Sequence, residues 1–330
     1  MSGSGGSAGS LAAGSAGKGG AAGASAGAAG GAGTSGGAGS ANGGAMNMAG
    51  TMNAGGAGTG GVSGQAGAAS GGSAGSVAGA AGGGGEPERS DGCDTSTSQA
   101  TEEWVQSMVT TDDGMRPYSV WLPENYDASR AYPVIVLLHG CGSGTNNVPL
   151  ERETGADAIL MRGTGSAADT CWDSGANGPD VAFFDAMVAD VEARFCADTS
   201  RIFAVGYSSG SWLANQLGCI RADVLRGIAT VAGGNPGVRN CGGPIAQMFV
   251  HDTGDTSNVI SGSESARDRL LTLNNCDESS EPVPEEPSPC VRYQGCDPGY
   301  PVVWCATSGE GHNRQDNLTA PAFWNFFQEL

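Results

Sequence analysis

Residues 202–210 read Ile-Phe-Ala-Val-Gly-Tyr-Ser-Ser-Gly, and Trp212, Leu213 and Leu217 follow at helical spacing. The apolar, β-branched start predicts a buried strand, and the later spacing predicts a helix. Between them, Gly206, Ser208 and Gly210 form a Gly-x-Ser-x-Gly turn, the pattern of a nucleophile elbow. The stretch therefore predicts an α/β fold in which a strand-to-helix turn presents the hydroxyl of Ser208.

The five-residue Gly-x-Ser-x-Gly pattern is weak by itself, because the first part of the chain repeats it at Ser7, Ser25, Ser35 and Ser73. Those serines lie in a Gly/Ala/Ser-rich segment with no strand or helix signal around them. Only the match at Ser208 has both flanking elements, so we take Ser208 alone as the candidate nucleophile.

Apolar runs alternate with helical patterns over the rest of the chain. The runs predict an early edge strand at 118–123 and buried strands at 133–138, 202–205, 227–232, 246–250 and 302–305. Helices are expected from residue 180, with Asp180 as the N-cap, and at 209–220, 265–273 and 320–330; residues 145–179 are expected to be irregular. This alternation predicts a mostly parallel, doubly wound sheet.

Composition divides the chain in two. More than half of the 59 glycines precede residue 86, where Lys18 is the one charged side chain, so residues 1–89 are predicted to be a disordered tether. Residues 90–330 are predicted to form one globular domain of ordinary size. The net charge of −19 argues against binding to nucleic acid or to an anionic membrane, and no apolar run is long enough to span a membrane.

Ten cysteines all lie in the globular part and none forms a Cys-x-x-Cys pair, which disfavours a zinc site and predicts disulfides. From their expected places at the two ends of the sheet, Cys141 and Cys171 form one candidate pair, and Cys196 and Cys219 another. Disulfides favour a secreted or cell-surface location, although no signal peptide is visible at Met1. No cofactor or metal is expected.

A serine nucleophile needs a base, and the sequence offers three histidines. The expected chain order is serine, acid, histidine, and His312 comes late enough to follow an acid. The acid should follow the strand that ends at Val250, where Asp252 and Asp255 are the candidates. We expect Asp255, beyond a glycine turn, to orient His312 and Asp252 to cap the turn.

Two backbone N–H groups should stabilise the negative charge that develops during acyl transfer. Ser209 follows the nucleophile and supplies one. Cys141 lies in the glycine-rich loop after the 133–138 strand and supplies the other, with His139 holding that loop by side-chain hydrogen bonds. Trp172 and Tyr207 are candidate substrate contacts; the alternative for Trp172 is to cover the edge of the core.

Residues Leu138-His139-Gly140-Cys141-Gly142, the elbow, the Asp255 turn and Gly311-His312 resemble polyhydroxybutyrate depolymerases, feruloyl esterases and acetylxylan esterases of carbohydrate esterase family 1. The resemblance spans about residues 100–330. It implies an α/β-hydrolase fold, a Ser208–His312–Asp255 triad, an oxyanion hole at Cys141 and Ser209, and no metal.

We therefore expect a monomeric serine esterase that acts on a polymeric or small ester, with the tail as a possible surface attachment. A polyhydroxyalkanoate is the first expectation for the polymer, and feruloyl or acetyl groups on plant cell-wall polysaccharide are the alternative. A non-catalytic binding module and a serine peptidase are the rival functions.

Overall fold

The computed structural model describes residues 86–235 and 237–330. The predicted tether, residues 1–89, lies outside these residues except for its last four. Glu88 and Arg89 both contact β5: the amide of Glu88 donates to the carboxylate of Asp198 at 3.1 Å, and Arg89 forms a β-bridge with the same residue. The start of the domain at residue 90 stays a prediction.

A ten-stranded mixed sheet forms the centre of the described part, in the order β1-β2-β4-β3-β5-β6-β7-β10-β9-β8. The six strands from β4 to β10 run parallel, and the strands at both edges pair antiparallel. The strands are β1 Trp104–Thr111, β2 Gly114–Trp121, β3 Tyr132–Leu138, β4 Ile159–Gly163, β5 Ala197–Tyr207, β6 Gly227–Val231, β7 Ala246–Asp252, β8 Val283–Pro284, β9 Cys290–Arg292 and β10 Val302–Thr307.

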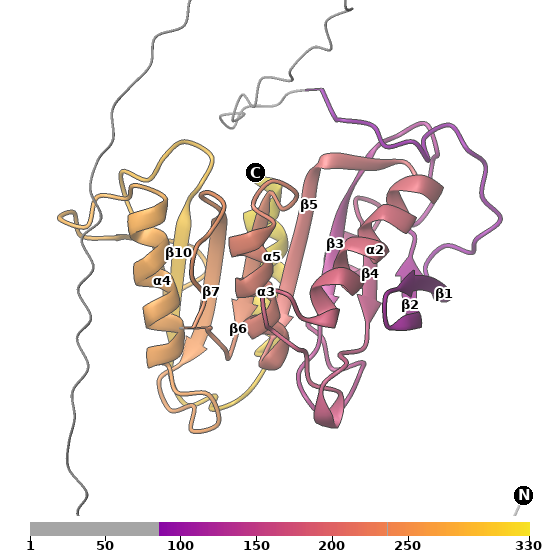
Figure 1. The fold of residues 1–330 in the computed structure, drawn as a ribbon. Helices are drawn as coiled ribbons and strands as arrows, with labels where there is room; N and C mark the ends of the chain where they lie inside the picture. The colour runs from indigo at the N-terminus through magenta and orange to yellow at the C-terminus, as the bar shows by residue number, and fades with distance from the viewer. Residues whose placement is uncertain (1–85, 236) are drawn as a thin grey trace, which may run out of the picture. The chain divides into compact units, whose positions relative to one another are not determined.

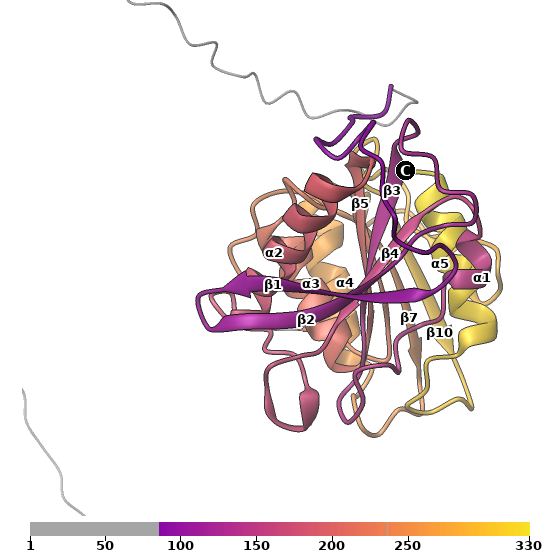
Figure 2. The same cartoon turned by 90° about the vertical axis from the view of Figure 1, so that its right-hand side faces the viewer.

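Helices cover both faces of this sheet (Figures 1 and 2). Helices α2 Pro179–Arg194, α3 Ser209–Ile220 and α4 Ser261–Leu273 lie on one face, and α1 Glu151–Thr154 and α5 Asp316–Gln328 lie on the other. A short 3-10 turn, η1, spans Ala168–Thr170. None of the helices in the described part is long and apolar enough to cross a membrane.

The side chains of β3 point alternately to the two faces of the sheet and contribute to the apolar core on each face. Val134 and Val136 belong to the cluster under α2, α3 and α4, whereas Ile135 and Leu137 belong to the cluster under α5. All seven residues of β3 are buried, because successive side chains point to opposite faces and both faces are covered. The predicted doubly wound arrangement is therefore present in an α/β-hydrolase-type sheet.

Three sequence expectations are corrected here. The 118–123 run is not an edge strand, since β2 lies between β1 and β4 and β1 is the edge. The stretch predicted as irregular contains β4, whose five residues are too few for a clear pattern. Gly178, not Asp180, is the N-cap of α2, and the buried carboxylate of Asp180 instead accepts N–H bonds from Ser166 and Asp173.

The described part holds five disulfides, Cys93–Cys196, Cys141–Cys171, Cys219–Cys241, Cys276–Cys296 and Cys290–Cys305. The expected Cys141–Cys171 pair is confirmed. The expected Cys196–Cys219 pair is wrong, because the segment around Cys93 pairs with residues at the start of β5, and Cys219 at the end of α3 faces the loop that carries Cys241.

The turn from β5 into α3 depends on two glycines. Ser208 has a positive φ of 54°, which side chains rarely adopt. A Cβ atom on Gly206 would lie 2.4 Å from the carbonyl oxygen of Gly210, and one on Gly210 would lie 2.1 Å from that of Leu138. Both distances are far inside van der Waals contact, so α3 can approach the end of β3 only without these side chains.

We expect Gly210→Ala to destabilise the protein by about 3 kcal/mol or more, since the obstructing atoms belong to the backbone. The matched control is Gly243→Ala, where the added Cβ would lie 3.9 Å from Ala222 and should change stability by less than about 0.5 kcal/mol. Urea unfolding of the three proteins measures the difference, and equal stabilities would contradict the close approach.

Candidate functional site

Three connecting segments meet at the carboxyl ends of the parallel strands β5, β7 and β10. Ser208 follows β5 directly, Asp255 lies shortly after β7, and His312 lies in the loop after β10. The His312 Nε2 atom is 3.0 Å from the Ser208 hydroxyl oxygen, and its Nδ1 atom is 2.7 Å from Asp255 Oδ2. The structure thus brings together the serine, histidine and carboxylate that the sequence singled out, in one hydrogen-bonded chain.

Asp255 is held as a carboxylate by several donors. It is only 5% exposed, and its Oδ1 atom accepts the backbone N–H groups of Ser257 and Asn258 at 2.8 and 2.9 Å. Burial by itself would raise the pKa of this carboxyl, but the hydrogen bonds from His312 and from the two amides outweigh it and hold the pKa below its usual value. Asp255 is therefore ionised where it faces the imidazole.

The second acid candidate, Asp252, serves a different contact. Its carboxylate accepts the N–H of Gly254 at 2.8 Å, and on its other oxygen the N–H of Glu310 at 2.9 Å and the hydroxyl of Thr307 at 3.3 Å. Asp252 caps the local turn, as the sequence suggested, and also ties the end of β7 to the loop that carries His312.

His251 is fully buried beside Asp255. Its Nδ1 atom pairs with the hydroxyl of Ser263 at 2.7 Å, and its Nε2 atom with the carbonyl of Asn258 at 2.8 Å and more distantly with Asp255 Oδ2 at 3.4 Å. Because both ring nitrogens are engaged, His251 holds the loop around Asp255 from behind. It does not contact Ser208.

The glycine-rich loop after β3 is held from several directions. The Gly140 N–H donates to Asn146 at 2.9 Å, the Gly142 N–H donates to the carbonyl of Asp169 at 2.6 Å, and Cys141 is bonded to Cys171. No hydrogen bond among the described residues engages the Cys141 N–H. The N–H of Ser209, the first residue of α3, has no partner within its helix.

The buried side chains of His139 and Trp172 pack against the glycine-rich loop. His139 Nε2 accepts the Gly165 N–H at 3.3 Å, so Nδ1 carries the hydrogen that is donated to the Gly140 carbonyl at 2.6 Å. Burial lowers the His139 pKa, which keeps the ring neutral. Trp172 is 3% exposed, its ring lies tilted against the His139 ring with centroids 4.9 Å apart, and it donates to the His139 carbonyl at 2.9 Å. These contacts favour the core-covering interpretation of Trp172.

Tyr207, the other candidate substrate contact, packs behind His312. The two ring centroids are 5.4 Å apart, and the tyrosine hydroxyl donates to the His312 carbonyl at 3.3 Å. A Cβ on Gly140 would lie 2.9 Å from the tyrosine ring. Tyr207 therefore separates the histidine loop from the glycine-rich loop, and substrate contact by this residue stays a prediction.

Asn258 is a site residue that sequence reasoning missed. Its side-chain N–H₂ lies 3.4 Å from the Ser208 hydroxyl oxygen and 2.9 Å from the Ala232 carbonyl, while its backbone N–H donates to Asp255. It lies in an unpatterned stretch, Thr256-Ser257-Asn258, that reads as an ordinary turn. Only the folding of the loop against Ser208 reveals its contacts.

Comparisons with known proteins identify the family of the chain. No family model matches the chain. Feruloyl esterase C of Emericella nidulans is 30% identical over 233 residues, which cover 64% of this chain and 83% of the relative. The chain belongs to the feruloyl esterase family. Feruloyl esterase D of Neurospora crassa is 29% identical over 257 residues, covering 68% of this chain and 86% of the relative.

A solved acetyl xylan esterase from Aspergillus awamori has a similar fold, with a TM-score of 0.52, 17% identity, and coverage of 67% of this chain and 99% of that one. This family membership makes the protein a carboxylic ester hydrolase of the serine-hydrolase type. The resemblance to feruloyl and acetylxylan esterases is confirmed.

Asp252 generates a pH-dependent prediction. Burial would raise its pKa, but hydrogen bonds from Glu310, Gly254 and Thr307 lower it below the usual value. The unfolded chain therefore binds this proton more readily, so the stabilisation is complete above the unfolded pKa of about 3.9 and is lost as the pH falls through the lower folded pKa.

We expect Asp252→Asn to lower the free energy of unfolding by about 1–3 kcal/mol at pH 6, and the difference from the unmodified protein to shrink towards pH 3. Urea unfolding at both pH values measures it. Asp223→Asn, at an exposed position, is the control and should have little effect at either pH. A destabilisation of the same size at both pH values would contradict the linkage.

Proposed function

We propose that this protein hydrolyses feruloyl esters on plant cell-wall polysaccharide. The observation that carries the proposal is the 30% identity to Feruloyl esterase C over most of that relative's length, combined with the Ser208–His312–Asp255 chain of hydrogen bonds. Of the two polymer classes considered from the sequence, the relatives favour this one over polyhydroxyalkanoates. They equally give no support to a non-catalytic module or a peptidase.

The proposed reaction proceeds through an acyl-enzyme. In its first half, Ser208 Oγ attacks the ester carbonyl carbon while His312 Nε2 takes the hydroxyl proton. The 3.0 Å distance between these atoms is within direct proton-transfer reach. Asp255 keeps the imidazole in the tautomer whose Nε2 is unprotonated and stabilises the imidazolium that forms. The tetrahedral intermediate then expels the alcohol, which receives its proton from His312, and leaves an acyl group on Ser208.

The second half of the reaction repeats these steps with water. His312 takes a proton from a water molecule that attacks the acyl-enzyme carbonyl, and returns the proton to Ser208 Oγ as the carboxylic acid leaves. In both halves the carbonyl oxygen becomes negative. The N–H groups of Cys141 and Ser209 are the proposed donors to it, and the start of α3 adds the positive end of a helix dipole.

We propose that the protein acts outside the cytoplasm. The five disulfides of the described residues are typical of an oxidising compartment. A neutral polysaccharide also meets no electrostatic penalty from a chain with a net charge of −19. Residues 1–89 would then connect a monomeric catalytic domain to a surface.

Ser208→Ala should lower kcat at least about 10⁴-fold on every ester, because the variant loses the attacking oxygen. The assay compares methyl ferulate, acetylated xylan and a polyhydroxybutyrate suspension, and the expected preference of the unmodified protein is for methyl ferulate. Ser265→Ala, on the exposed side of α4, is the control and should retain full activity. Activity of Ser208→Ala, or a preference for the polyester, would refute the proposal.

Asn258 gives a second prediction. Its amide lies beside Ser208 Oγ and directs the hydroxyl proton towards His312, so it acts as a positioning residue. We expect Asn258→Ala to lower kcat for methyl ferulate about tenfold, the equivalent of one hydrogen bond, with a smaller change in KM. Asn125→Ala, at an exposed turn, is the matched control. A rise in KM without a fall in kcat would contradict this role.

A further inference from the structure

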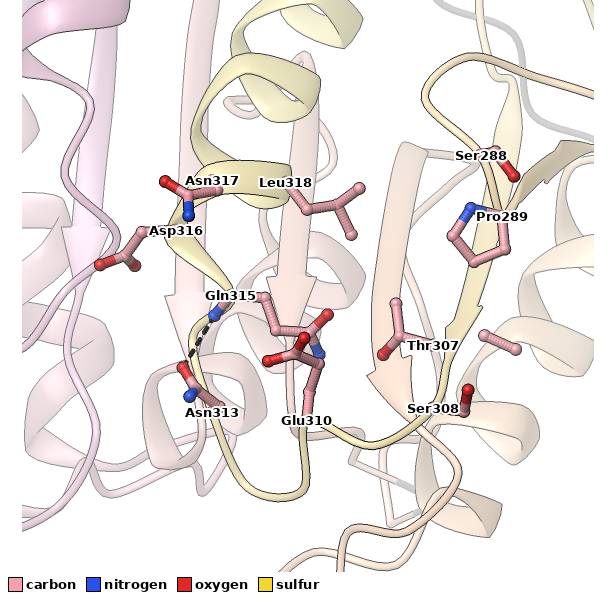
Figure 3. Close-up of a pocket in the computed structure, with 11 residues that line it drawn as sticks. Ser288, Pro289, Thr307, Ser308, Glu310, Asn313, Gln315, Asp316, Asn317 and Leu318 are labelled. Atoms are coloured by element: carbon pink, nitrogen blue, oxygen red, sulfur yellow. Dashed lines mark hydrogen bonds between the residues drawn. The ribbon is translucent and has the colours of Figure 1, made fainter.

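A cavity of about 660 Å³ lies beside the loop that carries His312. Its walls are the end of β10, residues 306–308, the first turn of α5, and the turn between β8 and β9 (Figure 3). The volume falls in the range of small-molecule sites in proteins. The residues placed around it have no role in the proposed ester chemistry.

Two polar residues that line this cavity, Thr307 and Gln315, are buried, and of these Gln315 has the side-chain atom without a partner. Gln315 is 8% exposed and has a left-handed backbone conformation, with φ 56° and ψ 45°. Figure 3 shows its side chain extending from the start of α5 towards Thr307, with the amide in the space between them. The Nε2 atom is buried and makes no hydrogen bond to any described residue. A buried donor without a partner is unfavourable, so this amide points to a ligand atom that accepts.

The backbone of Gln315 is fixed independently of its side chain. Its N–H donates to Asn313 Oδ1 at 3.0 Å, and its carbonyl accepts the N–H groups of Leu318 and Thr319 at 2.8 and 2.9 Å. These bonds fix the backbone from which the side chain extends. The backbone conformation of this position therefore does not depend on a ligand.

The remaining lining groups select the chemistry of that ligand. Amide, hydroxyl and carboxylate groups line the cavity, and none of its described lining residues is Lys, Arg or His. Glu310 is exposed beside Gln315 and repels an anion, whereas the Asp316 side chain points to the other side of α5, where it pairs with Arg314. A single facing carboxylate is a poor cation site, so a neutral molecule with hydroxyl groups fits best.

A sugar residue has the required combination. A hydroxyl oxygen can accept from Gln315 Nε2, while hydroxyl protons can be donated to Glu310 and Asn313. Pro289 and Leu318 add an apolar surface of the kind that packs against the C–H face of a sugar ring. Glu310 and Asn313 flank His312 in the same loop, so a chain bound here lies next to the proposed ester site.

We propose that this cavity is a subsite for sugar residues of the neutral polysaccharide whose ester is cleaved at Ser208. The inference rests on the proposed function for the identity of the polysaccharide. It assigns Gln315 as the central donor and Glu310 as an acceptor.

The test measures binding directly, without ester hydrolysis. Isothermal titration calorimetry of the full chain uses unesterified xylohexaose as the probe. Gln315→Met keeps the side-chain volume and removes the donor, so we expect xylohexaose to bind about tenfold more weakly, as for one lost hydrogen bond. Because the amide has no protein partner, we expect Tm without sugar to stay at or above that of the unmodified protein.

Gln328→Met, at an exposed position near the other end of α5, is the matched control and should bind as the unmodified protein does. Should Gln315→Met fail to fold, Glu310→Gln serves instead, with an expected several-fold loss. The subsite is refuted by an absence of binding at millimolar xylohexaose, by equal affinity in all variants, or by a galacturonate hexamer that binds as tightly as xylohexaose.

Failure of this inference is separable from failure of the proposed function. Methyl ferulate has no sugar, so its hydrolysis tests the feruloyl esterase activity alone. Gln315-dependent binding of xylohexaose by a protein that does not cleave methyl ferulate would uphold the subsite and refute the proposed function. Cleavage of methyl ferulate by a protein that does not bind xylohexaose would uphold the proposed function and refute the subsite.

Discussion

The close approach of α3 to the end of β3 is the constraint on which the rest of this structure depends. Gly210 lies against the carbonyl of Leu138, and Gly206 lies against the backbone of Gly210. Ser208, between these glycines, has its positive-φ conformation and lies against Gly140 of the loop that contains Cys141. A side chain at either glycine would separate the serine from the donors that surround it.

The loops around Ser208 are connected mainly through buried carboxylates. Asp252 joins the end of β7 to the loop after β10, and Asp255 receives His312 on one oxygen and two backbone N–H groups on the other. Asp180 does the same for the loop beside Cys171, where it also pairs with Arg116 at 2.6 Å. Each carboxylate accepts several donors, which offsets the cost of its burial and ties together segments that are far apart in the sequence.

The three histidines have different roles because they differ in burial and in hydrogen-bond partners. His139 and His251 are fully buried with both ring nitrogens engaged, so their rings are structural supports. His312 is partly exposed and has one nitrogen on a carboxylate and the other on a hydroxyl. Only this environment leaves an imidazole free to accept and release a proton, and it explains why three chemically identical side chains have different roles.

By itself, the sequence determined the elements with strong local patterns. The continuous apolar run of β3 and the Gly-x-Ser-x-Gly turn after β5 are each encoded within a few residues, and the order of serine, acid and histidine then indicated Ser208, Asp255 and His312. The tertiary structure alone placed the five-residue β4 inside the sheet, paired Cys196 with Cys93, and brought Asn258 to Ser208 and the amide of Gln315 into a cavity. These features depend on contacts between segments far apart in the chain, for which neighbouring residues carry no periodic signal, so they are decided only when the strands assemble.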